Sequence, residues 1–181
     1  MPRGRPLPRL WGWVLGALWL LTGPAAHAAL VLDDSASRIE AWPAVTVLSD
    51  PGKQLDLDEV RAATARFAAP RSAYATLGLR KDAVWLRLPV SVAAQSDGRW
   101  ILDIDYAVLN RVDLHVVRDG QLVQHAVLGN LQPFSQRPMR SRSHAVAQCV
   151  HGCDVRLRLQ QSQPMVGDDQ RYALVALHQG L

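Results

Sequence analysis

Alternation between apolar and polar residues dominates the chain from residue 83 onward. In the run AVWLRLPVSV (83–92), valine and leucine occupy every second position, and Trp85, Arg87, Pro89 and Ser91 lie between them. A period of two places the aliphatic residues on one face of a β-strand. Further strands are predicted in the runs RWILDIDY (99–106), RVDLHVV (111–117), QLVQHAVLG (121–129), DVRLRLQ (154–160) and RYALVAL (171–177).

Turn and helix signals divide the chain between these runs. The dipeptide Asp119-Gly120 predicts a tight hairpin between two strands. The segment LDEVRAATARF (57–67) predicts one helix, with Asp56 as its N-cap and Glu59 as the reciprocal half of a capping box. Many short strands, one minor helix and no strand–helix–strand rhythm predict an all-β fold, an antiparallel β-sandwich or jelly roll.

The first 28 residues have the features of a secretory signal peptide. Three arginines precede the apolar run LWGWVLGALWLL (10–21), and the triplet Ala26-His27-Ala28 fits a cleavage site after Ala28. An apolar run of this length is shorter than the roughly 20 residues that span a bilayer as a helix. We therefore expect cleavage, export to the periplasm and one mature domain over residues 29–181; an uncleaved membrane anchor is the alternative.

Net charge changes when the leader is set aside. The whole chain carries a formal charge of +4, but the leader holds three arginines and no acidic residue, so +1 remains. This balance gives no reason to expect a nucleic-acid partner. The sequence also contains no glycine-rich phosphate loop, and we expect no cofactor.

The two cysteines, Cys149 and Cys153, lie four positions apart around a glycine. In an oxidising compartment we expect them to form a disulfide that closes a small loop. Free thiols are one alternative. A metal site that adds His144 and His151 is another, although zinc sites usually have tighter or paired spacings.

Charged and aromatic residues occupy the polar side of the predicted strands. If consecutive strands pair, six charged or titratable side chains share one surface: Arg87, Asp103, Asp105, Arg111, Asp113 and His115. One interpretation is a ladder of exposed ion pairs. The other is a binding site for a sugar-like ligand, in which Trp85 stacks on the ligand while carboxylates and guanidinium groups bind its hydroxyls. Trp100 and Tyr106 lie on the apolar side and are expected in the core.

Three segments, in this order and spacing, resemble one known family: VWLRL (84–88), WILDIDYAVLNRVDLHVVRDG (100–120) and GNLQPFSQRPMRSR (129–142). The sequence resembles the type 2 extracellular domain of seven-transmembrane receptors with diverse intracellular signalling modules, over about residues 47–163. The resemblance implies a periplasmic jelly-roll sandwich, similar to carbohydrate-binding modules, that senses a small ligand. In such receptors a membrane bundle passes the signal to a histidine kinase or diguanylate cyclase. After residue 28 the sequence has no apolar run of 18 residues, so these membrane and output parts are not expected within it.

The proline-bounded segment of the third block has its own expected role. Prolines 133 and 138 restrict the backbone and predict a stiff crossing between strands, with Phe134 plugging the sandwich edge. Arg137 is then expected either to pair with Asp103 and Asp105 or to contact a ligand.

Catalysis is not expected. A glycosidase needs two carboxyl groups that face each other across a cleft, one of them with a raised pKa. Asp103 and Asp105 lie on one strand in arginine-rich surroundings, which favour two ionised acids. The sequence therefore predicts a non-catalytic sensing domain for a carbohydrate or similar polar ligand, with a membrane receptor as partner. The alternative is a structural domain that dimerises or docks another protein.

Overall fold

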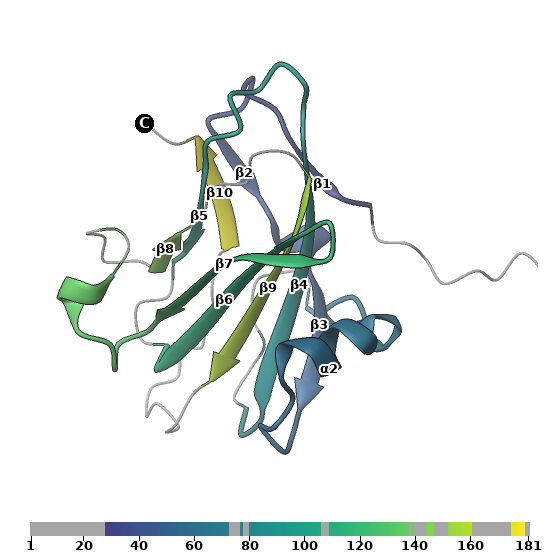
Figure 1. The fold of residues 1–181 in the computed structure, drawn as a ribbon, viewed down its shortest axis with the longest axis vertical. Coiled ribbons are helices and arrows are strands. Elements are labelled where there is room, and N and C mark those ends of the chain that lie inside the picture. The colour runs from purple at the N-terminus through teal and green to yellow at the C-terminus, as the bar shows by residue number, and fades with distance from the viewer. Residues whose placement is uncertain are drawn as a thin grey trace, which may run out of the picture.

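The computed structural model describes residues 28–72, 77, 80–105, 109–137, 139, 144–146, 152–160 and 175–179. The expected signal peptide, Tyr106, Pro138 and Cys149 therefore lie outside the described residues. The described chain forms two β-sheets that face each other, with a short helix against one of them (Figure 1). The expected all-β sandwich is confirmed. No helix within these residues is long and apolar enough to span a bilayer.

Within the described residues the larger sheet has six strands, in the order β1-β4-β9-β6-β7, with β3 also paired to β4. Its strands are β1 (Leu30–Leu32), β3 (Thr46–Asp50), β4 (Ala83–Val92), β6 (Arg111–Arg118), β7 (Gln121–Leu128) and β9 (Cys153–Gln160). All its pairs are antiparallel except β1 with β4, which is parallel.

The smaller sheet has four antiparallel strands, in the order β2-β10-β5-β8. These strands are β2 (Arg38–Glu40), β5 (Trp100–Ile104), β8 (His144–Val146) and β10 (Val175–Gln179). The expectation that consecutive strands pair is wrong for β4, β5 and β6. Strand β5 crosses to the smaller sheet, and β9 occupies the place between β4 and β6.

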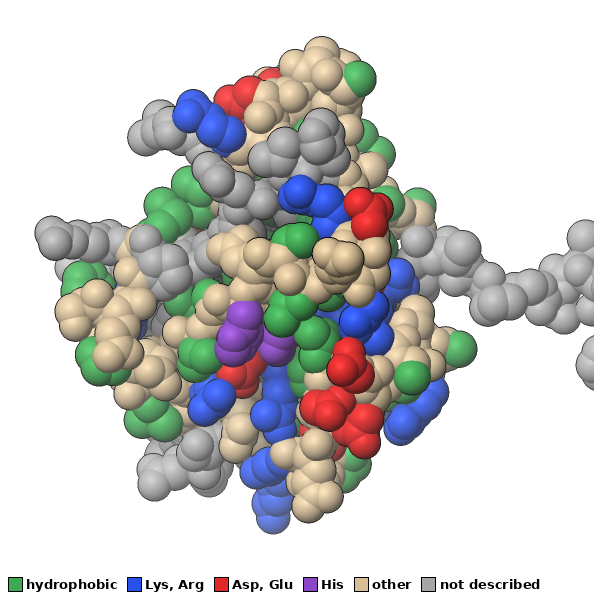
Figure 2. All heavy atoms as spheres, in the orientation of Figure 1, with side chains coloured by type: hydrophobic (Ala, Val, Ile, Leu, Met, Phe, Trp, Pro, Cys, Tyr) green, Lys and Arg blue, Asp and Glu red, His purple; other side chains and the backbone are tan. Residues whose placement is uncertain are grey.

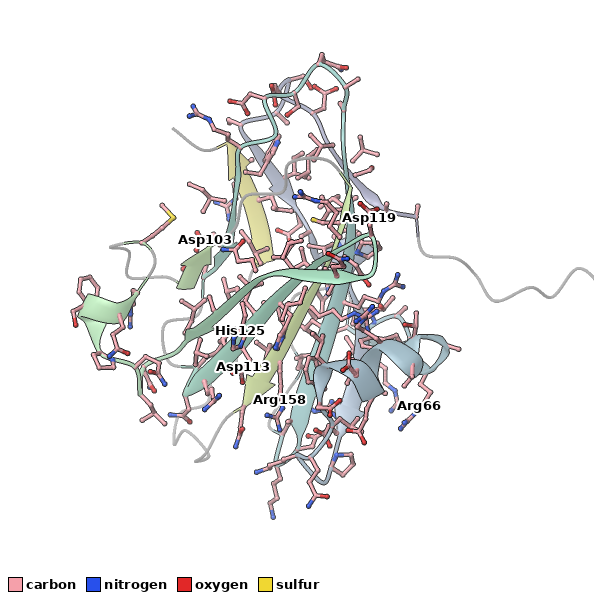
Figure 3. The ribbon with its side chains drawn as sticks, viewed as in Figure 1. Arg66, Asp103, Asp113, Asp119, His125 and Arg158 are labelled. Atoms are coloured by element: carbon pink, nitrogen blue, oxygen red, sulfur yellow. The ribbon has the colours of Figure 1, made fainter. Side chains whose placement is uncertain are left out.

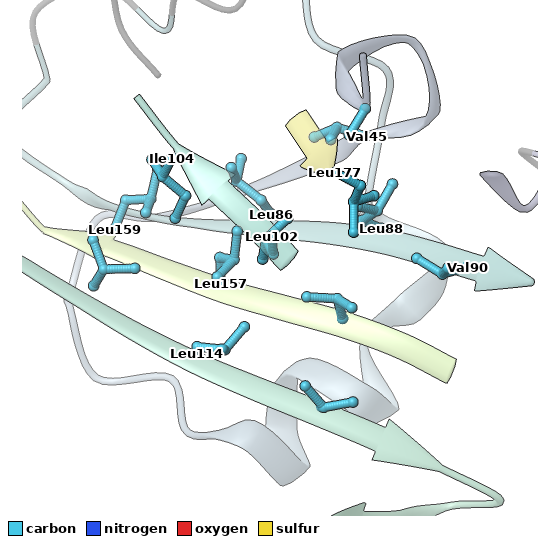
Figure 4. Close-up of a cluster of buried hydrophobic side chains, with 14 of the residues drawn as sticks. Val45, Leu86, Leu88, Val90, Leu102, Ile104, Leu114, Leu157, Leu159 and Leu177 are labelled. Carbon is cyan, nitrogen blue, oxygen red and sulfur yellow. The ribbon is translucent and has the colours of Figure 1, made fainter. Parts of the chain in front are cut away.

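The core lies between the two sheets and follows the period of two. Leu86 and Leu88 of β4, Leu114 of β6 and Leu157 of β9 point towards Leu102 and the other aliphatic residues of the smaller sheet (Figure 4). Burial of each such side chain stabilises the fold by about 1.5–3 kcal/mol. Trp100 is fully buried, as its position on the apolar side predicts.

Two glycine positions fix the ends of β7. The hairpin between β6 and β7 turns at Asp119 and Gly120, which both have positive φ, as the predicted two-residue turn requires. At the other end Gly129 has a φ of +130°, and a Cβ there would lie 2.2 Å from the carbonyl oxygen of Asn110. Only glycine fits this close approach, so the chain turns sharply out of the sheet before the proline-bounded segment.

Helix α2 (Leu57–Ala62) lies against the outer face of the larger sheet, over β3 and β4 (Figure 1). The predicted capping box is confirmed: the Asp56 carboxylate accepts from the backbone N–H of Glu59, and the Glu59 carboxylate accepts from that of Asp56. The helix is shorter than expected, because the chain continues from Thr64 to Arg66 as the 3-10 turn η3. Further 3-10 turns are η2 (Trp42–Ala44) and η4 (Phe134–Gln136).

Candidate functional site

The outer face of the larger sheet carries most of the predicted polar residues. Strand pairing places the row Trp85, Arg158 and Asp113 beside a second row of Arg87, Arg156, His115 and His125. Figure 3 shows Asp113, His125 and Arg158 close together over β6, β7 and β9. We call the following six residues the outer-face cluster: Trp85, Arg111, Asp113, His115, His125 and Arg158.

Three rings of the cluster stack across the sheet. The indole of Trp85 lies 5.6 Å from the imidazole of His115, and this imidazole lies 4.7 Å from that of His125, measured between ring centroids. The guanidinium of Arg158 lies 6.0 Å from the centroid of the Trp85 ring. Trp85 is 1% exposed, His115 is half-buried and His125 is exposed. The stack therefore leads from the interior to solvent, where the two histidines form a surface patch (Figure 2).

Ion pairs fix the charged members of the cluster. Arg111 binds the buried carboxylate of Asp113 through two of its nitrogens, with a shortest contact of 2.8 Å. This pairing raises the pKa of Arg111. Arg158 donates to the backbone carbonyl of Lys53 and lies 3.9 Å from the carboxylate of Asp50. Strong charge-assisted contacts of this kind hold side chains in fixed positions.

Burial governs the titration of His115. Loss of solvent lowers its pKa from the ordinary value, and the neighbouring imidazole of His125 lowers it further. The carboxylate of Asp113 and a hydrogen bond to the backbone of Arg156 oppose this shift. Nδ1 of His115 has no hydrogen-bond partner among the described residues. In a neutral imidazole with its proton on Nε2, this Nδ1 is an unpaired acceptor.

A separate ion network anchors helix α2 to the sheet. The carboxylate of Asp154 accepts from Arg87 at 3.0 Å and from Arg156 at 2.8 Å. Arg156, itself only 3% exposed, also donates to the backbone carbonyl of Val60 and to the hydroxyl of Thr64. A buried guanidinium needs such partners to offset its desolvation. This network gives Arg87 a structural role beside the cluster.

The expectation that Trp85 is an exposed stacking platform is wrong. Its side chain lies on the predicted polar side of β4, but α2 covers that side here. Val60 of the helix and Leu48 of β3 pack against the indole in a small second core. An amphipathic helix packs its apolar face against apolar side chains of the sheet. Here the side chain that the helix covers is Trp85.

The structure divides the other predicted residues between the two sheets. Arg87, Arg111, Asp113 and His115 share the outer face of the larger sheet, as predicted. Asp103 lies on β5 of the smaller sheet (Figure 3). The exposed Asp105 follows directly after that strand. The prediction that both aspartates share this face is wrong, because β5 does not pair with β4 or β6.

The proline-bounded segment is also placed differently from expectation. Phe134 is 55% exposed and does not plug the sandwich edge. The guanidinium of Arg137 lies over the Phe134 ring, 5.1 Å from its centroid. The expected roles of Arg137, towards Asp103 and Asp105 or towards a ligand, stay predictions.

Sequence reasoning missed four residues of this face: His125, Asp154, Arg156 and Arg158. Asp154, Arg156 and Arg158 lie at the polar phase of β9, whereas His125 lies on β7, where the alternation is weak. The signal was present in the alternation of DVRLRLQ. What the pattern cannot give is that β9, late in the chain, lies between β4 and β6.

Cys153 begins β9, is nearly buried and is disulfide-bonded. The sequence contains only one other cysteine, Cys149. Cys149 lies outside the described residues, so the Cys149–Cys153 pairing stays a prediction that mass spectrometry with and without reductant tests directly. Among the side chains that are described, no group of three or more histidine, cysteine, aspartate or glutamate residues is placed to hold a metal ion.

Fold and cluster together define a β-sandwich domain with a polar, partly buried outer face. The sequence matches the family model described as 7TMR-DISM extracellular 2 over residues 43–167, which is more than half of the chain. The chain belongs to this family of extracellular sensor domains of membrane receptors, and the resemblance found in the sequence is confirmed. No curated protein matches the sequence.

Proposed function

We propose that this chain is a non-catalytic periplasmic domain that senses a small hydroxyl-bearing ligand, a carbohydrate or a similar polar molecule, at the outer-face cluster. The family supports the coarser part of this proposal, an extracellular sensor domain of a membrane receptor. The geometry of the cluster supports the location of the binding site and the hydroxyl-bearing chemistry of the ligand.

One observation carries the proposal. Three buried nitrogens of the cluster lack a hydrogen-bond partner among the described residues: Trp85 Nε1, His115 Nδ1 and Arg158 Nε. Buried polar atoms in folded proteins are nearly always paired, and an unpaired one costs about 1–3 kcal/mol. Three such atoms in one group of contacting side chains favour a binding role for the group.

Their chemistry favours a hydroxyl. The indole N–H and the guanidinium N–H only donate, whereas Nδ1 of His115 accepts in the tautomer that carries the ring proton on Nε2. A hydroxyl group both donates and accepts, so its chemistry suits the two donors and the acceptor alike. With the ring proton on Nε2, a carboxylate would accept from Trp85 and Arg158 but would leave Nδ1 without a donor.

Access to the cluster begins at the exposed ring of His125. The three stacked rings run inward from this point to Trp85. We expect a ligand to enter beside His125 and to shift the hairpin of β6 and β7, which Arg61 of α2 contacts through the carbonyl of Gly120. Binding would therefore change the contact between the helix and the hairpin.

A thermal-shift screen with monosaccharides, oligosaccharides and polyols, followed by calorimetry on each hit, tests the proposal. We expect a hit whose affinity falls at least about tenfold in His115→Phe, which keeps a ring but removes the acceptor. Asp103→Asn is the matched control, because it removes a charge on the other sheet and is expected to leave the affinity unchanged. Equal loss in both variants, or no hit in the panel, would contradict the proposal.

A partner-docking domain or homodimer is the second candidate function. Strand β7 pairs only with β6 among the described strands, and Leu122 and Val123 on it are about half exposed. Exposed edge strands are natural sites for added strands. A dimer in sedimentation that Leu122→Lys abolishes, together with an empty ligand screen, would favour this candidate.

A further inference from the structure

Exposed apolar side chains gather on the loop that follows β7. Among the described residues, six large hydrophobic side chains are exposed, and three of them lie within this loop: Leu131 at 65%, Phe134 at 55% and Met139 at 39%. The loop extends beyond the two sheets, at the left of Figure 1, and hydrophobic atoms reach the surface there in Figure 2. We call Leu131, Phe134 and Met139 the apolar tip.

The backbone holds the tip in place instead of letting it fold back onto the core. The N–H of Asn130 donates to the carbonyl of Leu109 at 2.8 Å, and that of Gln132 to Gly129 at 3.2 Å. In turn η4, the N–H of Gln136 donates to the carbonyl of Pro133 at 2.9 Å. A loop with its own hydrogen bonds presents its side chains at a defined place. Exposure of three large apolar groups is therefore a built feature of this loop.

Charged residues in this part of the sequence have one sign. From Gly120 to Cys153 the sequence contains no aspartate or glutamate, but it contains Arg137, Arg140 and Arg142. The guanidinium of Arg137 lies against the ring of Phe134, so an apolar group and a cation are presented together. This pairing fits an anionic bilayer, in which negatively charged headgroups cover an apolar layer of acyl chains.

We propose that the apolar tip docks on an anionic membrane surface, with Phe134 and Leu131 entering the interfacial layer and Arg137 binding lipid phosphate. Single scattered apolar residues on a surface need no explanation, but a cluster on a projecting, acid-free loop does. The charge disfavours a basic protein surface and fits an anionic partner, and a phospholipid bilayer combines such charge with an apolar interior that suits Phe134 and Leu131. This contact does not depend on ligand binding at the outer-face cluster.

Flotation of the chain with vesicles tests the proposal, with phosphatidylcholine alone compared with a mixture that contains phosphatidylglycerol. We expect binding to the mixed vesicles that weakens as salt is raised, and little binding to the neutral vesicles. Phe134→Ser is expected to reduce binding at least about tenfold. Leu122→Ser, which removes a similarly exposed apolar side chain on β7, is the matched control and is expected to bind like the parent chain.

Arg137→Gln separates the two components of the contact. This substitution is expected to weaken binding to the mixed vesicles and to make that binding less dependent on salt. The circular dichroism spectrum and the melting temperature should stay unchanged. Absence of binding to either vesicle, or equal losses in Phe134→Ser and Leu122→Ser, would overturn the proposal. A dimer that depends on Phe134 and forms without lipid would instead assign the tip to a second copy of the chain.

Discussion

His115 joins the buried and exposed parts of the outer-face cluster. Its ring lies between the buried indole of Trp85 and the exposed imidazole of His125. The charged groups around it are the carboxylate of Asp113 on its own strand and the guanidinium of Arg158 on β9. Burial and the second imidazole dominate and lower its pKa. The lowered pKa favours the neutral imidazole, which has one nitrogen that can accept from a ligand hydroxyl.

A pH titration tests this residue. The pKa of His115 is lower in the folded chain than its ordinary value of about 6.5, so the unfolded chain binds more protons near that pH. We expect stability to fall as the pH drops below about 7 towards the folded pKa, and His115→Gln to flatten this part of the profile.

In NMR titrations, His125→Gln should raise the pKa of His115, because it removes a like charge. A His115 pKa at or above the ordinary value would contradict the account.

At the scale of secondary-structure elements, the sequence predicts the individual strands and turns but not which distant strands pair. The run AVWLRLPVSV coincides with β4, and the capping box and the Asp119-Gly120 hairpin were readable from the sequence. These features depend on neighbours along the chain. The position of β9 between β4 and β6, and the transfer of β5 to the other sheet, depend on contacts between distant segments. The candidate site follows this division.

The same division explains the outcome for individual site residues. The period of two gave the face of Arg111, Asp113 and His115 correctly, since all three lie on one strand. It could not show that α2 covers Trp85, because which part of a sheet a helix covers is set by tertiary packing. Asp103 lies on the predicted polar side of its strand, but that strand belongs to the smaller sheet and not to the larger one.

Helix α2 depends on its cap because it has only six residues. Asp56→Ala removes the carboxylate that accepts from the backbone N–H of Glu59 and should lower the free energy of unfolding by about 1 kcal/mol. Asp58→Ala is the matched control: its side chain is 87% exposed and pairs only with Arg61 among the described residues, so we expect a change within about 0.5 kcal/mol. Denaturant unfolding of both variants measures the difference. Equal effects would mean that the cap does not hold the helix on Trp85.

At the scale of the whole molecule, polar recognition and membrane contact fall on different parts of the sandwich. The outer-face cluster lies on the larger sheet under and beside α2, whereas the apolar tip extends from the loop after β7 (Figure 1). Strand β7 connects the two, since His125 lies within it and Gly129 turns the chain from it into the loop. A ligand that moves β7 would therefore also move the segment that leads to the tip.

The central claim is that the outer-face cluster binds the ligand, and NMR of the labelled chain tests it most directly. Titration with a sugar or polyol found in the screen should shift the indole N–H resonance of Trp85 and the ring resonances of His115 and His125. The resonances of Asp103 on the smaller sheet, and of Asp105 directly after β5, should stay in place. Shifts confined to the smaller sheet, with an unchanged Trp85 indole, would contradict the account.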